Sequence, residues 1–256
     1  MAHPLVSGWA FTLKVTNVKN RFYIFLLVAA CFAVSGVQRA AGTPEPSAVP
    51  VAWELSLKPF SPMTIQVDTG KGATVYWYMI YTVTNNSGQD VEFHPEITRV
   101  SEIETEGTSQ TAGGTPSDPP QITTEPAIVG IHPAVYKAIA ERHAKTHPFL
   151  VSPVNAITRL LQGKDNAVTS VAIFPQLAQR VSRFTIYVGG LSGETLARPN
   201  PTYKAPVGES DEKADDANPK FFVLKKTLAM PYILPGDLST RRYATPKLGR
   251  LGWVMR

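Results

Sequence analysis

Residues 75–88, VYWYMIYTVTNNSG, have the pattern of a long strand that runs into a turn. Successive side chains of a strand point to opposite faces. This alternation divides the stretch into Val75, Trp77, Met79, Tyr81 and Val83 on one face and Tyr76, Tyr78, Ile80, Thr82 and Thr84 on the other. Both faces carry large apolar or aromatic side chains, although covering one core requires only one such face. The second face must therefore lie under another part of the protein or meet a ligand.

The same period of two recurs on both sides of this stretch and indicates half-buried strands. The segments are VAWELSLK (51–58), MTIQVD (63–68), DVEFHPEITRV (90–100), VTSVAIF (168–174), RFTIYVGGL (183–191), KFFVLKKTLAM (220–230) and LGWVMR (251–256). About eight short strands separated by turn signals predict a mainly β fold, an antiparallel β-sandwich. Residues 85–88, NNSG, tolerate positive φ and predict a hairpin between the strands that flank them.

One inserted helix is predicted at residues 133–146, PAVYKAIAERHAKT. Val135 and Ile139 are four residues apart and share one helix face. Pro133 lies at the start, where proline is tolerated, and Pro148 follows the end. The apolar face of this helix must be buried, and the second face of residues 75–84 is the obvious place.

Two long mobile loops are predicted at residues 101–126 and 198–219. Both segments are rich in Pro, Gly, Ser and charged residues and contain few large apolar side chains, so they bury too little to order themselves. The predicted organisation is a linker at residues 43–50 followed by a single sandwich domain at residues 51–256.

Residues 1–42 predict a signal peptide or an N-terminal membrane anchor. Lys14, Lys19 and Arg21 precede the apolar run FYIFLLVAACFAVSG (22–36), and a segment rich in small residues and proline follows. The run is short for a membrane span, which needs about 20 residues. We therefore expect an exported protein, periplasmic, at the cell surface or extracellular, that contacts membrane only through this segment.

Cys31 is the only cysteine of the chain and lies inside the apolar run. The residues VAAC (28–31) resemble a bacterial lipobox, which implies possible lipidation of Cys31. The apolar residues 32–34, FAV, depart from that pattern, since polar residues usually follow the cysteine. Cleavage near residues 36–41 is the other interpretation, and in either case the domain has no disulfide.

The net charge of +5 comes mainly from the N-terminal segment. Residues 1–42 contain four of the 25 basic residues and no acidic one, so the remainder carries only +1 and predicts no nucleic-acid partner. Residues 90–125 hold eight acids against Arg99, and residues 220–256 hold eight bases against Asp237. We expect the two segments to complement each other within the fold, although an anionic partner is the alternative.

Several patterns suggest chemistry, but each lacks a necessary part. GLSGE (190–194) resembles the hydrolase elbow G-x-S-x-G, but Glu194 replaces the second glycine and no histidine follows the serine. We interpret it as a tight turn at a strand end. His143 and His147 are spaced as in a zinc protease helix, but the catalytic glutamate of H-E-x-x-H is missing.

Acidic clusters offer no better candidates. Glu92, His94 and Glu96 share one strand face, which can present only two adjacent ligands to a metal that needs three or four. The paired acids at 211–212 and 215–216 lie in a predicted mobile loop, where catalytic carboxylates cannot keep a fixed separation. The sequence thus predicts no catalytic residue, metal site or cofactor.

Several motifs resemble a known group of proteins. YTVTNNSG (81–88) followed by an alternating strand is similar to the mid-domain hairpin of bacterial immunoglobulin-like modules. YVGGLSGE (187–194), VLKKT (223–227), YILPGD (232–237) and WVMR (253–256) resemble segments of uncharacterised exported bacterial proteins with an immunoglobulin-like β-sandwich. The resemblance covers residues 51–256 and implies that fold, but it brings no activity, ligand or site residue.

Three functions are left open by these patterns. The first is a non-enzymatic protein of the cell envelope that binds an envelope or extracellular protein or has a structural role. The second is a carbohydrate-binding module that uses Tyr76 and Tyr78 as an exposed aromatic platform. The third, a hydrolase, has the least support, because a convergent set of His, Glu and Ser is not evident.

Overall fold

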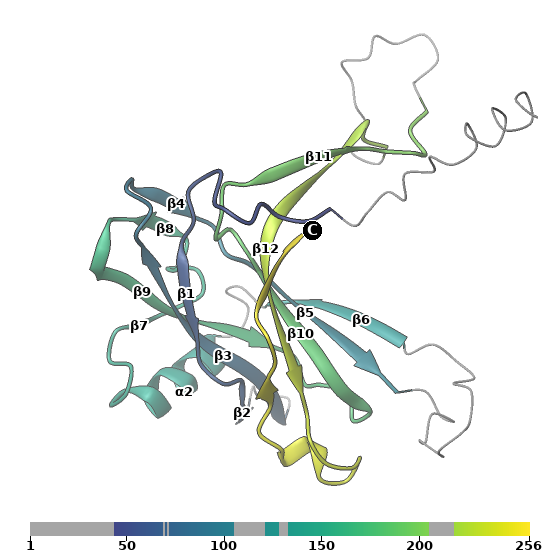
Figure 1. Ribbon diagram of the computed structural model, residues 1–256. Coiled ribbons are helices and arrows are strands. Elements are labelled where there is room, and N and C mark those ends of the chain that lie inside the picture. Colours follow the sequence, from purple (N-terminus) through teal and green to yellow (C-terminus); the bar gives the residue numbers. More distant parts are fainter. Residues whose placement is uncertain (1–43, 69, 71, 105–120, 128–132, 205–217) are drawn as a thin grey trace, which may run out of the picture. The chain divides into compact units, whose positions relative to one another are not determined.

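The computed structural model describes residues 44–68, 70, 72–104, 121–127, 133–204 and 218–256 (Figure 1). Pro44–Arg256 form one compact unit. This unit is mainly β, with antiparallel sheets and one α-helix among the described residues. That helix is too short to cross a bilayer, and no other helix of the described ranges is long and apolar enough to do so.

The first sheet is built around β3 (Ala73–Asn85), the strand that contains the opening stretch. β9 (Gly163–Phe174) pairs with one edge of β3, and β1 (Ser56–Pro59) and β2 (Met63–Asp68) share the other edge. These pairs are antiparallel. β7 (Leu150–Val151) extends the sheet by pairing in parallel with β9.

The second sheet is built around the long strand β12 (Phe221–Ile233). Its strand order continues through β10 (Val181–Gly189) and β5 (Glu96–Ile103) to the edge strand β6 (Gln121–Pro126). The remaining elements are β11 (Thr195–Pro199), β13 (Lys247–Leu248) and β14 (Gly252–Met255), which pair with β12; the two-stranded sheet β4 (Val91–Phe93) and β8 (Thr158–Leu160); α2 (Pro133–His143); and the 3-10 helix η1 (Arg241–Tyr243).

The larger core lies between these two sheets. Trp77 and Met79 of β3 are buried in one cluster with Phe184 of β10 and Tyr232 of β12. The ring of Trp77 meets Phe184 edge-on at 5.9 Å, and Phe184 stacks on Tyr232 at 5.1 Å, geometries that aromatic pairs favour. The predicted core face is therefore confirmed from Trp77 to Val83, whereas Val75 is only half-buried.

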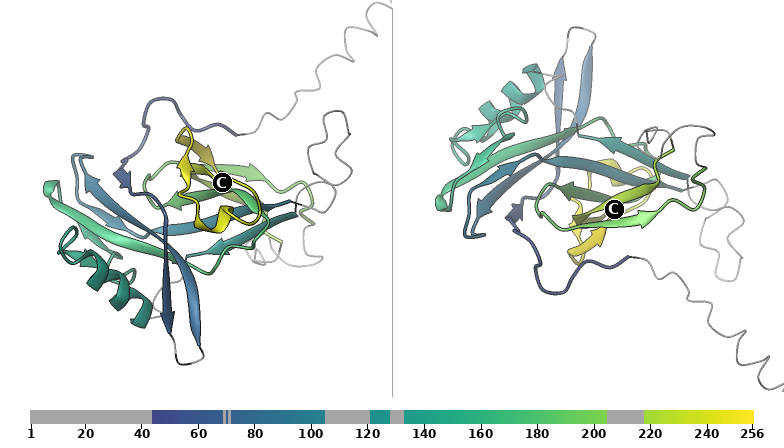
Figure 2. Two further views of the ribbon diagram at one scale, coloured as in Figure 1. Left: turned by 90° about the horizontal axis from the view of Figure 1, so that it is seen from below. Right: turned by 90° about the horizontal axis from the view of Figure 1, so that it is seen from above.

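The other face of β3 is covered by α2 (Figure 2). Tyr78 and Ile80 of β3 form a second buried cluster with Val135 and Ile139 of α2, and all four are 0% exposed. The prediction that the helix would cover this face is confirmed. The helix itself ends at His143, three residues earlier than predicted, and a turn leads from there to Pro148.

Two predictions about strands are wrong. The described residues form fourteen strands instead of about eight. Several of these strands are only two to four residues long, which is too short for a clear alternation. Asn85–Gly88 do form a turn, with Gly88 at φ 88, but not a hairpin. Both edges of β3 are already paired with other strands, so β4 leaves the turn to pair with β8.

The two predicted mobile loops are wrong at their ends. Residues 101–103 belong to β5 and residues 121–126 form β6, while residues 198–199 belong to β11. The amino-acid composition did not predict β6, because this strand is ordered by main-chain pairing with β5 and not by burial of large apolar side chains. The middle of each predicted loop, 105–120 and 205–217, lies outside the described residues.

The predicted charge complementarity is visible in two ion pairs that join the acidic and basic segments. Lys225 lies 2.6 Å from Glu96, and Arg241 lies 3.2 Å from Glu104. Both acids belong to the segment around β5, and both bases belong to the C-terminal segment. Such pairs at the protein surface, one of them partly buried, contribute little stability, about 0–1 kcal/mol each, but they agree with intramolecular pairing.

Truncation of the helix contact should weaken the whole unit. We expect Ile139→Ala to lower the free energy of unfolding by about 2–5 kcal/mol, because the change leaves a cavity between α2 and β3. Lys137→Ala on the exposed side of the same helix should change it by no more than about 0.5 kcal/mol. Urea titration monitored by circular dichroism measures both free energies of unfolding. Equal and small effects of the two substitutions would contradict the conclusion that α2 covers the second face of β3.

Candidate functional site

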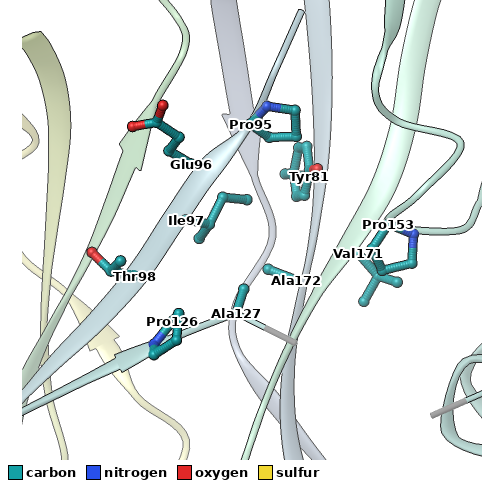
Figure 3. A pocket seen from close by; sticks show the side chains of 10 residues that line it. All are labelled: Tyr81, Pro95, Glu96, Ile97, Thr98, Pro126, Ala127, Pro153, Val171 and Ala172. Atoms are coloured by element: carbon teal, nitrogen blue, oxygen red, sulfur yellow. The ribbon is translucent and has the colours of Figure 1, made fainter. Parts of the chain in front are cut away.

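A pocket of about 380 Å³ lies where the strand pair β5–β6 faces β3 and β9 (Figure 3). Its size falls within the range of small ligand pockets. The lining is mostly apolar: Tyr81, Ile97, Ala127, Val171, Ala172 and the prolines Pro95, Pro126 and Pro153. Glu96 and Thr98 are the other lining residues. The pocket is thus suited to an apolar group.

Five separate parts of the chain place these side chains. Pro95 lies between β4 and β5, so that Glu96 begins a new strand and Ile97 faces the first sheet. The N–H of Ala127 donates to the carbonyl oxygen of Ile97 at 2.8 Å, which continues the pairing of β6 with β5 beyond Pro126. Ala172 of β9 has a short side chain on the facing sheet, which leaves room for the pocket.

The polar groups of the pocket are already engaged. Glu96 forms the ion pair with Lys225 at 2.6 Å. Burial raises the pKa of Tyr81 to about 12, although a hydrogen bond with Ser170 acts in the opposite direction. Tyr81 is therefore a neutral phenol at ordinary pH. These side chains can orient an apolar ligand, but they do not form a nucleophile with its base.

Arg99 stabilises the framework next to this pocket. It is 1% exposed, and its Nε donates to Glu125 Oε2 on β6 at 2.9 Å. Its Nη2 donates to Glu125 and also to the carbonyl oxygen of Pro175 at 2.9 Å, just beyond β9. Burial lowers the pKa of Arg99, and Glu125 opposes that shift. The side chain therefore joins β5 and β6 to the end of β9.

The aromatic platform predicted as an alternative ligand site is not exposed. Tyr76 is 6% exposed and Tyr78 is 0% exposed, because α2 covers their face of β3. The hydroxyl of Tyr78 makes a 2.9 Å hydrogen bond with Nε2 of His143. Tyr76 and Tyr78 thus pack the second core, and the expectation of a sugar-stacking surface is corrected.

His143 and His147 anchor the end of α2. Their rings lie 5.7 Å apart, and His147 also packs edge-on against Phe60 at 4.7 Å. Thr146 contacts Nδ1 of both imidazoles, at 3.4 and 3.0 Å. Within the described ranges no group of three or more His, Cys, Asp or Glu side chains is placed to hold a metal ion.

The GLSGE segment is a structural turn. Gly190 has φ 79, and a Cβ on it would lie 2.1 Å from the carbonyl oxygen of His94, so only glycine fits. Glu194 accepts a hydrogen bond from the N–H of Ser47 at 2.7 Å and lies 3.1 Å from Nζ of Lys226. The interpretation as a tight turn is confirmed.

Two further sequence candidates, Cys31 and the paired acids at 211–212 and 215–216, lie outside the described residues. The pocket itself was not predicted, because its walls come from strands distant in sequence. Its nearest sequence signal is the set of prolines at or near the ends of the strands around it. No protein-family model, curated protein or solved structure matches the chain.

The contact of α2 with Tyr78 should depend on pH. Burial lowers the pKa of His143 below its ordinary value of 6.5, and the nearby His147 and Arg142 lower it further. The unfolded chain therefore binds more protons than the folded chain as the pH falls through 6.5. This contribution to stability is complete above pH 6.5 and decreases below it, down to the pKa of the folded state.

Urea midpoints measured at a series of pH values test this expectation. His143→Gln should flatten the decline below pH 6.5, whereas His94→Gln, at an exposed position, should leave it unchanged. A wild-type decline that persists fully in His143→Gln would assign the pH dependence to another group.

Proposed function

We propose that the protein is an exported, non-catalytic component of the cell envelope that binds an extended apolar segment of another protein. We infer that its fold is an immunoglobulin-like β-sandwich, which is supported by two largely antiparallel sheets that share one core. The pairing of β4 with β8 departs from the hairpin on which the resemblance rested. The general sandwich is therefore better supported than the immunoglobulin-like topology.

Export rests on the N-terminal sequence. The basic residues before the apolar run at 22–36 are typical of segments that direct a chain to the membrane. We propose that this run, although short for a complete span, is retained in the membrane as an anchor, so that the compact unit remains attached to the envelope. The absence of cysteine from residues 44–256 is compatible with an oxidising compartment, although it does not require one.

The observation that carries the binding proposal is the apolar pocket beside the edge strand β6. β6 pairs with β5 along one edge, and no described strand pairs with its other edge. An extended segment could add to that edge through main-chain hydrogen bonds. One of its apolar side chains would then enter the pocket next to Pro126 and Ala127. Main-chain pairing would supply affinity, and the pocket would select the side chain.

The structure favours this function over the two alternatives. Carbohydrate binding was expected to use Tyr76 and Tyr78, which are buried. Hydrolysis requires an activated nucleophile, whereas Glu96 in the pocket is paired with Lys225 and Tyr81 remains neutral. An apolar pocket next to an unpaired strand edge is better suited to recognition than to bond cleavage.

A photo-crosslinking amino acid at the exposed position Thr124 of β6 tests this proposal. In envelope preparations from the producing cell, we expect it to capture a partner protein. Ala127→Trp should abolish the crosslink by filling the pocket, whereas Ala144→Trp, the same change at an exposed site beyond α2, should preserve it. A crosslink that survives Ala127→Trp in a folded protein would contradict binding at the pocket.

A further inference from the structure

β11 and the first residues of β12 form a two-stranded ribbon that extends from the body at the end opposite η1 (Figure 1). Thr195–Pro199 pair with Phe221–Lys225 in this ribbon. Beyond these strands, the N–H of Asn200 donates to the carbonyl oxygen of Lys220 at 2.9 Å. The ribbon is therefore an ordered projection of the second sheet.

The ribbon exposes large apolar side chains on both faces. Phe222 is 46% exposed and lies on the same face as Leu228, but it extends past the core that buries Leu228. Phe221 and Val223 point to the opposite face and are 49% and 61% exposed. A flat protein surface would cover only one of these faces. A fluid lipid interface can surround both.

The chain enters the compact unit at the base of this ribbon. The N–H of Ser47 donates to Glu194 in the turn before β11, and the carbonyl oxygen of Ser47 lies 3.5 Å from Nζ of Lys226 in β12. Lys226 is 2% exposed and lies 3.0 Å from Glu54 and 3.1 Å from Glu194. This buried group of charges fixes the entry point beside the ribbon.

The connection to the apolar run at 22–36 is short. Seven residues lie between Gly36 and Pro44, and the eight steps of an extended chain, at most about 3.6 Å each, span roughly 29 Å. If the run is held in a membrane, the base of the ribbon cannot be far from the bilayer surface. Because the run is short for a complete span, it is a weaker anchor than a transmembrane helix, and a second contact would strengthen the attachment.

We propose that the ribbon docks on the surface of the phospholipid bilayer, with Phe221, Phe222 and Val223 entering the interface. The proposal rests on the proposed retention of residues 22–36 as an anchor. The contact is apolar: the sequence at 205–217, between the two strands, contains five acids and one lysine, so attraction to anionic lipid is not its source. Docking should therefore occur on zwitterionic lipid and persist at high salt.

Depth-dependent fluorescence quenching tests this contact in the full chain. Cys31→Ser removes the only cysteine, and Val223→Cys then introduces a single site for an environment-sensitive dye. Leu238→Cys is the matched control, because Leu238 is 50% exposed and lies beyond the opposite end of β12. The proteins are reconstituted in phosphatidylcholine vesicles with and without nitroxide-labelled phosphatidylcholine.

We expect the nitroxide lipid to quench the dye at position 223 at low and high salt, and to leave the dye at position 238 unquenched. Phe222→Asp should abolish the quenching at 223 without lowering the thermal midpoint. Equal quenching at both positions, or none at 223, would overturn the proposal. The second result in a vesicle-bound chain would leave the anchor intact and refute only the ribbon contact.

Carbonate extraction of the same vesicles reports separately on the anchor. A chain that is extracted although its dye at position 223 was quenched would contradict retention of residues 22–36, and the ribbon contact would then rest on the quenching alone. The pocket crosslink at Thr124 is independent of both results, so failure of the binding proposal and failure of the ribbon contact are distinguishable.

Discussion

Burial of β3 on both faces is the constraint on which the rest of this architecture depends. Trp77 and Met79 need an apolar cover on one side, and Tyr78 and Ile80 need another on the other side. The second sheet supplies the first cover and α2 supplies the second. Deleting a large buried side chain costs about 2–5 kcal/mol, so neither cover can be lost without a large fraction of the stability of a typical domain.

The buried charges around Lys226 have a different role: they fix the position of the chain entry relative to the ribbon of β11 and β12. Lys226 is held between Glu54 and Glu194 at the base of the ribbon. Burial lowers its pKa, but the two carboxylates outweigh that effect and raise it, so the lysine remains charged. A buried ion pair adds little net stability, but removing one partner is costly. We therefore regard this group as fixing the chain entry and the ribbon relative to each other, which both the anchor and the docking proposal require.

Periodicity was sufficient to assign the two faces of β3 and the helix that covers one of them, because both depend on local spacing. Periodicity was insufficient where pairing or packing with a segment distant in sequence decides the structure. β6 is ordered by main-chain pairing, which leaves no apolar signature. The alternation of residues 220–230 predicts a strand, but it cannot show that the opposing core ends before Phe222 is reached. The pocket required Ile97, Ala127 and Ala172 to meet from three strands or their ends, and no short sequence pattern encodes that meeting.

Native-state hydrogen exchange along β3 tests the central claim most directly, because it measures the free energy of each local or global unfolding event separately. If both covers are integral, the amides of residues 77–81 should exchange only through global unfolding, with one common free energy and the denaturant dependence of the whole unit. The buried turns of α2 should have the same free energy. Exchange of α2 and β3 through a low-energy opening that leaves the second sheet protected would contradict the account, because it would show that the helix is a detachable cover.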